Sequence, residues 1–300
     1  MRKYIIHIIP LLLSACIKEI PYDSNTNTPS MPAVHCFITP DSVLTADCRL
    51  TAPFGRKDIP IAGAGFYILK SGKKSDSSLY TGNGIHRFAT NSVKAGDTFV
   101  FSGNIAGFNA FEIPCIAPRE IFIQQFDTTR LLVPGIGRAF SIELKFNDDA
   151  IFENFYRCYM YKSAYQYIYD NNGKISDSTL KRELIALFSD NQAAVENTFN
   201  NYTSREIIFS DATFNGVKQN MVFYTSDPLV KTNRERPVGI EFYLENISKS
   251  LFDFYNTRNA HIWQQQSISQ LPGKIVGNVP GAFGVVGAYT TNSRYVMLKR

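Results

Sequence analysis

Short runs in which apolar and polar residues alternate recur along this chain of 300 residues. In one of them, residues 33–38, the apolar side chains of Val34, Cys36 and Ile38 occupy every second position. Because successive side chains of a strand point to opposite faces, a period of two predicts a strand with one buried face. Gly, Asn and Asp turns separate such runs about every ten to twelve residues, which is typical of β-sandwiches.

The expected strands fall into two groups, separated by the proline-containing segment 114–119, which indicates a domain junction. We therefore predict an all-β protein with two antiparallel, sandwich-like domains. The first is an immunoglobulin-like domain over residues 33–117, and the second covers residues 118–300. The segments 180–188 and 248–265 have helical spacing, so the second domain is expected to contain one or two helices. The helix near 248–265 should pack on the C-terminal sheet.

Residues 1–15 have the organisation of a signal peptide. Two basic residues precede an apolar run that is well short of the ~20 residues needed to span a bilayer as a helix. The run ends in Leu-Ser-Ala-Cys, which resembles the lipobox of bacterial lipoproteins. We predict cleavage between Ala15 and Cys16 and attachment of lipid to Cys16. Several acyl chains at one residue give a stable membrane anchor.

Residues 16–32 are expected to form a flexible tether, because a segment rich in Asn, Thr, Ser and Pro cannot bury a core. The pair Lys18-Glu19 resembles the charged signal that follows the lipid cysteine in Bacteroidota lipoproteins sent to the cell surface. An ordinary solvated linker is the alternative. From these features we expect a protein anchored by its lipid in the outer membrane and facing the cell exterior.

Four cysteines follow Cys16, and two of them belong to the first expected hairpin. Cys36 and Cys48 each lie six residues from Ser42 in the intervening turn, so symmetrical pairing places them opposite one another. A disulfide between them can form beyond the inner membrane, and two reduced core cysteines are the alternative. The chain has no Cys-x-x-Cys motif, which argues against a zinc knuckle or a thioredoxin-like site.

The sequence does not predict a catalytic site. His35, His86 and His261 lack the spacing of metal ligands, and no Gly-x-Ser-x-Gly or phosphate-loop motif occurs. The segment 170–177 lacks the spaced carboxylates of a calcium loop, and its Asp-Asn-Asn-Gly start indicates a hairpin turn. With 31 basic against 26 acidic residues, the charge gives no argument for nucleic-acid binding. We therefore expect no catalytic residue, metal or cofactor.

A tyrosine-rich run over residues 156–169 is the strongest candidate for a binding surface. As a strand it places Tyr159, Tyr161, Tyr165 and Tyr167 mostly on one face. An exposed row of tyrosines contacts sugars or peptides well, because each ring offers apolar area and a hydroxyl. The other interpretation, which we favour, is an aromatic row that faces the core under the C-terminal helix.

Over most of its length the chain resembles a family of Bacteroidota outer-membrane proteins, domain-of-unknown-function family 4249. The stretches that carry the resemblance are 34–39, 49–54, 63–68, 96–114, 146–161 and 276–289. The last of these, VGNVPGAFGVVGAY, is the most specific. Its glycines are not followed by the helix and acid of a dinucleotide site, so we expect them to allow close backbone packing in a strand.

The resemblance implies an outer-membrane location. It also implies a gene neighbourhood, since members of this family are often encoded beside TonB-dependent outer-membrane transporters. It implies no established chemistry. We therefore expect a non-catalytic lipoprotein that serves as an accessory or binding partner of such a transporter in nutrient uptake. A surface enzyme that degrades a polymer is one alternative, and an adhesive or structural lipoprotein is another.

Overall fold

The computed structural model describes residues 30–52, 56–133, 137–189, 191, 205–226, 228, 232–265 and 273–297. The expected signal peptide, its cleavage site after Ala15, the lipid site at Cys16 and residues 16–29 of the expected tether lie outside these described residues. The tether is expected to extend to residue 32, but Pro32 already belongs to the first strand. Over the described ranges the protein consists of strands and one helix, α2 (Lys249–Gln265). No helix in these ranges is long and apolar enough to cross a membrane. The predicted all-β, sandwich-like fold is confirmed.

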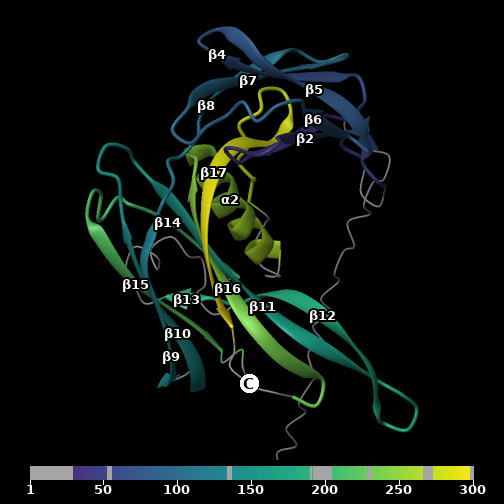
Figure 1. The fold of residues 1–300 in the computed structure, drawn as a ribbon. Helices are drawn as coiled ribbons and strands as arrows, with labels where there is room; N and C mark the ends of the chain where they lie inside the picture. Colours follow the sequence, from purple (N-terminus) through teal and green to yellow (C-terminus); the bar gives the residue numbers. More distant parts are fainter. Residues whose placement is uncertain are drawn as a thin grey trace, which may run out of the picture.

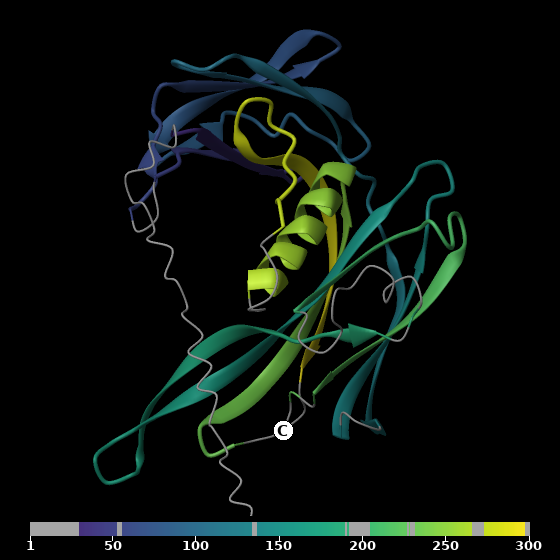
Figure 2. The ribbon, with the colours of Figure 1, turned by 180° about the vertical axis from the view of Figure 1, so that it is seen from behind.

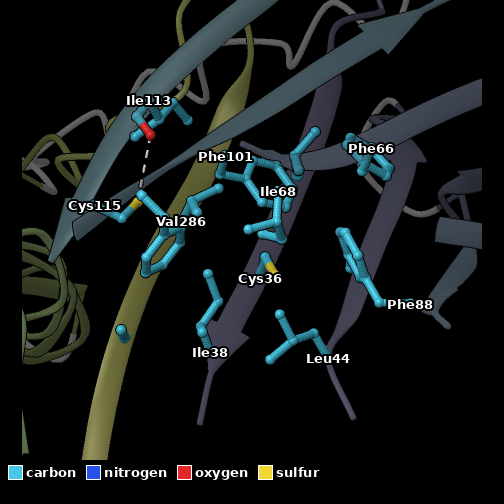
Figure 3. Close-up of a cluster of buried hydrophobic side chains, with 14 of the residues drawn as sticks. Cys36, Ile38, Leu44, Phe66, Ile68, Phe88, Phe101, Ile113, Cys115 and Val286 are labelled. Atoms are coloured by element: carbon cyan, nitrogen blue, oxygen red, sulfur yellow. Dashed lines mark hydrogen bonds between the residues drawn. The ribbon is translucent and has the colours of Figure 1, made fainter. Parts of the chain in front are cut away.

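The N-terminal sandwich contains β1 (Pro32–Ile38), β2 (Thr45–Leu50), β3 (Ile59–Pro60), β4 (Ala64–Lys70), β5 (Lys73–Gly82), β6 (Ile85–Phe88), β7 (Thr98–Ile105) and β8 (Phe111–Ile116). Its strands follow the order β1-β2-β6-β5-β4-β7-β8. The first half of β5 pairs with β4 and the second half with β6, so the sheet folds over on itself (Figure 1). Buried side chains from both layers, among them Cys36, Phe66 and Phe101, form one core (Figure 3).

The C-terminal sandwich contains β9 (Ile123–Val133), β10 (Gly137–Asn147), β11 (Phe155–Tyr169), β12 (Ile175–Ile185), β13 (Phe188–Ser189), β14 (Glu206–Ser210), β15 (Lys218–Ser226), β16 (Glu235–Ile247) and β17 (Phe283–Met297). A sheet of order β12-β11-β16-β17, with β14 also beside β11, packs on a second sheet of order β13-β15-β10-β9. Alternate residues such as Leu144, Met160 and Phe242 fill the core between them. The hairpin of β11 and β12 projects beyond this sandwich (Figures 1 and 2).

Helix α2 packs on the outer face of the C-terminal sheet, which confirms the helix predicted near 248–265 (Figure 2). Its buried residues Leu251, Phe254 and Tyr255 form a cluster with Phe155, Ile208, Ile247 and Val285 of the sheet. This cluster is separate from the core between the two C-terminal sheets. The sheet therefore has an apolar contact on each of its faces.

Strand β17 belongs to both sandwiches (Figure 1). Residues 283–288 pair in parallel with residues 33–38 of β1, and residues 289–297 pair antiparallel with β16. Val286 consequently lies in the N-terminal core, among side chains of β1, β4 and β7 (Figure 3). The N-terminal sandwich therefore extends beyond the expected span of 33–117, because it takes one strand from the other end of the chain.

Two glycines of β17 allow neighbouring elements to approach its backbone. Gly284 has a φ of 106°, and a Cβ there would lie 2.0 Å from the carbonyl oxygen of Val34 in β1. A Cβ on Gly287 would lie 2.5 Å from Cγ of Leu251 in α2. Only glycine tolerates both approaches. The expected close packing of this glycine-containing strand is confirmed.

The helix predicted over residues 180–188 is wrong, since most of that segment belongs to β12. The predicted hairpin turn before it is confirmed: Gly173 has a φ of 74°, and the Asp170 carboxylate accepts the N–H groups of Asn172 and Lys174 at 2.9 and 2.8 Å. From this turn, β12 runs back along β11 as its antiparallel partner. Pairing with a long neighbouring strand outweighs the helical spacing of the segment.

The predicted strand register, in which Cys36 lies directly opposite Cys48, is also wrong. Cys36 lies opposite Ala46 and Cys48 lies opposite Val34, because the centre of the pairing is Asp41, one residue earlier than the symmetrical count assumes. The cysteines of the described residues are all free and buried. Burial raises the pKa of the Cys48 thiol to about 11, so this thiol is protonated at neutral pH.

Replacing Gly287 with Ala is expected to destabilise the fold by about 1–3 kcal/mol, the usual effect of overpacking a close contact. The added Cβ cannot be accommodated unless α2 moves away from β17. Gly63→Ala is the matched control, because its new Cβ would meet only the Cβ of Ala106 at 3.5 Å. Equilibrium urea unfolding measures both variants, and equal stabilities would contradict this packing of α2.

Candidate ligand-binding site

A cavity of about 630 Å³, called the junction cavity below, lies where the two sandwiches meet. Its walls come from the start of β7 and the turn before it, the end of β8 and the linker after it, the turn before β11, the connection from β16 into α2, and the segment before β17. The walls are mostly apolar. The lining residues are Gly96, Thr98, 114–119, 152–155, 246–250, Asp253 and 276–278.

Polar side chains of β17 hold the linker that follows β8. Thr290, Asn292 and Arg294 each donate a side-chain hydrogen bond to a backbone carbonyl of the linker or of the first residue of β9, at 2.9, 3.1 and 2.8 Å. The acceptors are the carbonyl oxygens of Arg119, Ile121 and Ile123. The donors are every second residue of β17, and the acceptors are every second residue of the facing segment. This spacing is that of neighbouring strands, but the bonds come from side chains of β17 and not from its backbone. Sequence reasoning missed this contact, although polar residues at alternate positions of β17 are its signal.

The first turn of α2 forms another wall and is fixed to the edge of β17. Ser248, just before the helix, donates its N–H to the Ala288 carbonyl at 2.8 Å and accepts the Ala288 N–H with Oγ at 3.1 Å. The side-chain amide of Asn278 bonds to both the carbonyl and the N–H of Val286, at 2.7 and 2.8 Å. These side chains satisfy backbone groups that another strand would otherwise pair.

Two buried asparagines, Asn154 and Asn246, form part of the cavity wall. The Asn154 amide donates to the carbonyl oxygens of Asp149 and Phe152 at 2.9 and 2.8 Å. Asn246 donates to the carbonyl oxygen of Arg119 at 3.2 Å and to the side-chain oxygen of Asn154 at 3.3 Å. The two asparagines therefore connect the turn before β11 to the linker and to the end of β16.

Two cations line the cavity, and each has a carboxylate partner. Arg119 binds Asp149 at 3.0 Å and lies over the ring of Phe152. Lys249 binds Asp253 at 2.6 Å. Because both pairs are substantially exposed, they contribute little to stability, but they leave the lining with little net charge.

The arrangement suits the binding of a small organic molecule. A volume of about 630 Å³ lies within the usual range of ligand pockets. Mostly apolar walls favour a ligand with an apolar body, while the asparagines and the start of α2 can orient a polar group on it.

The structure brings Tyr159 and Tyr161 together with Tyr243 of β16 on the outer face of the C-terminal sheet. The rings of Tyr159 and Tyr243 stack with their centroids 4.9 Å apart, and Arg182 of β12 lies 3.9 Å from the Tyr161 ring centroid. These rings are half-buried and lie outside the buried core clusters. They do not face the core, and their binding of a ligand stays a prediction.

Tyr165 and Tyr167 lie further along β11, toward the tip of the hairpin. Arg236 of β16 lies 5.0 Å from the Tyr165 ring centroid. The backbone N–H of Tyr167 donates to the carbonyl of Arg234 at 2.9 Å. Of the four tyrosines expected to act together, only Tyr159 and Tyr161 contact each other among the described ring pairs.

A largely buried ion network connects this tyrosine face to α2. Arg157 of β11 binds Glu206 at 2.6 Å and Glu245 at 3.0 Å, and Arg258 of α2 also binds Glu206. Burial disfavours the charged form of Glu206, but the two arginines outweigh burial and hold its pKa below the usual range. Burial raises the pKa of Glu245, against the opposing effects of Arg157 and the Tyr159 hydroxyl. The network fixes the helix on the sheet.

The three histidines considered as metal ligands occupy β1, β6 and α2. His35 packs edge-on against Phe254, and the buried His86 bonds through Nε2 to the carbonyl of Ile61 at 2.9 Å. His261 lies in the last part of α2. Across the described ranges, no group of three or more His, Cys, Asp or Glu side chains is placed to hold a metal ion.

The fold and the cavity define an all-β protein of two sandwiches that share a strand, with a ligand-sized cavity at their junction. The chain belongs to the family DUF4249, described as a domain of unknown function, whose model matches residues 17–295. The family resemblance seen in the sequence is thereby confirmed. No curated protein sequence matches the chain.

Two solved structures show a distant likeness. One is a DUF4785 family protein from Legionella pneumophila, at 7% identity and a TM-score of 0.24, over 72% of this chain and 52% of that chain. This chain thus spans about half of that protein. The other is the collagen binding domain of the surface protein RspB of Erysipelothrix rhusiopathiae, at 8% identity and a TM-score of 0.21, over 90% of this chain and 97% of that one.

Replacing Glu206 with Gln is expected to destabilise the protein by about 2–4 kcal/mol, because Arg157 and Arg258 would lose the charge that both of them bind. Glu241→Gln is the matched control: its partner Arg182 is 46% exposed, so the loss should stay below about 1 kcal/mol. Urea unfolding at neutral pH compares the two variants. A Glu206 variant no less stable than the control would show that the network does not fix α2.

Proposed function

We propose that this protein is a lipid-anchored, non-catalytic binding protein of the outer membrane that serves a TonB-dependent transporter. The junction cavity carries the proposal, because it is a mostly apolar site of ligand size whose walls are already fixed by hydrogen bonds. Both sandwiches and α2 contribute to it, so a bound cargo molecule would contact every major part of the fold.

The N-terminal sequence supports the location. The Leu-Ser-Ala-Cys motif favours a lipid on Cys16, and the polar tether expected between Cys16 and β1 would then keep the sandwiches close to the membrane. Lys18-Glu19 favours the outer face of the cell. The partner is proposed from the sequence resemblance, which implies a gene often placed beside one for a TonB-dependent transporter.

In this role the protein captures a nutrient outside the barrel and presents it to the transporter. The junction cavity holds the cargo. The half-buried rings of Tyr159, Tyr161 and Tyr243 form a second surface, with Arg182 beside them, which suits contact with either the cargo or the barrel.

Cys16→Ala should release the protein from the membrane, because the lipid is its proposed anchor. Ser24→Ala in the tether is the control and should leave it in the membrane fraction. Detergent phase partitioning measures the release, and protease treatment of intact cells tests exposure at the surface. A Cys16 variant that still partitions with the membrane would place the anchor elsewhere.

The tagged wild-type protein, purified from detergent-solubilised outer membrane, should recover a TonB-dependent barrel in stoichiometric amount. Quantitative mass spectrometry of the eluate measures the ratio, and the Cys16→Ala protein serves as the unanchored control. Repeated recovery of the lipoprotein alone, together with turnover of a surface polymer, would instead favour an enzyme.

A further inference from the structure

We infer that the junction cavity recognises a neutral amide group carried on an apolar body, as in a short apolar peptide. The inference deepens the proposed binding role and rests on it. Three features of the cavity lead to it: a hydrogen-bond acceptor without a donor, the start of a helix, and apolar walls of little net charge.

Asn246 supplies the acceptor. It lines the cavity with only 5% of its surface exposed. Its Nδ2 donates to the carbonyl oxygen of Arg119 and to the side-chain oxygen of Asn154, and two acceptor partners fix the orientation of the amide. No described residue donates to its Oδ1, and this oxygen keeps accessible surface. Because Asn246 is otherwise buried, a ligand N–H would reach Oδ1 from the cavity.

The start of α2 supplies donors. Ser248, Lys249 and Ser250 line the cavity, and the N–H of Phe252 donates to the Ser248 carbonyl at 3.0 Å. The N–H groups before Phe252 have no carbonyl partner within the helix, as at any helix N-terminus. The Ser248 hydroxyl is engaged by the Ala288 N–H and by Ser250 Oγ. The dipole of the helix and these N–H groups favour a ligand carbonyl oxygen.

The charges of the lining favour a neutral polar group over an ion. Arg119 and Lys249 already bind Asp149 and Asp253, at 3.0 and 2.6 Å, and Glu153 adds a further negative charge. A ligand carboxylate would have to compete with these carboxylates, and a ligand ammonium would have to give up its water beside apolar walls. An amide offers one N–H and one C=O without the desolvation cost of an ion.

Apolar side chains surround these polar groups. Ile116, Phe152, Phe155, Ile247 and Val276 all line the cavity. Their removal from water would stabilise a bound apolar side chain. A short apolar peptide repeats the same unit, an amide next to an apolar side chain, and is therefore the ligand class that the cavity fits.

The first experiment compares three probes that share one apolar body and differ in the polar group: 4-phenylbutanamide, 4-phenylbutanoate and 4-phenylbutylamine. Titration calorimetry or ligand-observed NMR on the full-length protein in detergent gives the affinities at neutral pH. The amide should bind at least roughly fivefold more tightly than either ion, about the effect of one net hydrogen bond. Tighter binding of an ion, equal binding of all three, or no binding overturns the inference.

The second experiment places the binding in the cavity. Ile116, which lines the cavity, is 56% exposed, and Ile175, which lies outside it on β12, is 54% exposed. Ile116→Trp should fill part of the cavity and weaken the amide probe by about tenfold or more, whereas Ile175→Trp should leave its affinity unchanged. Equal thermal stability of both variants shows that each is folded. Equal affinities of the two variants would place the probe elsewhere and overturn the inference.

The third measurement addresses the peptide class. An N-acetylated apolar dipeptide amide should compete with 4-phenylbutanamide for the wild type, and failure to compete overturns the peptide assignment. These results are separate from those for the proposed function. Recovery of a barrel without probe binding would support the transporter role and overturn this inference. Probe binding without recovery of a barrel would support this inference and overturn the transporter role.

Discussion

The pairing of β17 with both β1 and β16 is the contact on which the rest of the structure depends. One extended strand enters two sandwiches and changes partner between Ala288 and Tyr289, so the halves cannot separate without breaking backbone hydrogen bonds. Side chains at Gly284 or Gly287 would hold β1 or α2 away from it. The arrangement of the two sandwiches, the position of α2 and the junction cavity all follow from the path of this strand.

The cavity lies where β17 has a strand on only one of its two edges. The first half of β17 pairs with β1 and its second half pairs with β16. Where it changes partner, Ser248 and Asn278 bond to the backbone of its first half, and Thr290 bonds to the linker from its second half. Side chains thus bond to backbone groups that a further strand would otherwise pair, and the space beside them stays open. Walls held in this way are preorganised, which lowers the entropic cost of binding a ligand.

Features that depend only on residues close together in the sequence could be predicted. The alternating strands, the helix near 248–265 and the turn after Asp170 all have local causes, and the glycines of β17 are themselves the signal of close packing. By contrast, β5 (Lys73–Gly82) is largely polar and was not expected as a strand. Its one buried side chain, Asp76, accepts the N–H of Thr90 at 3.1 Å. The conformation of β5 is therefore set by segments that lie beside it in the folded protein. The helix assigned to 180–188 failed for the same reason, since β11 decides the conformation of that segment.

The candidate site was beyond such reasoning because its parts meet only in the folded chain. Thr290 and Arg119 are 171 positions apart, and the pairing of β1 with β17 joins the two ends of the described chain. The tyrosine run could be found by its composition, but the acceptor on Asn246 has no signal in its local sequence. A site built from five segments that are separate in the sequence also has a physical consequence. A ligand that contacts all of them binds only the assembled junction, so its binding energy adds to the stability of the contact between the sandwiches.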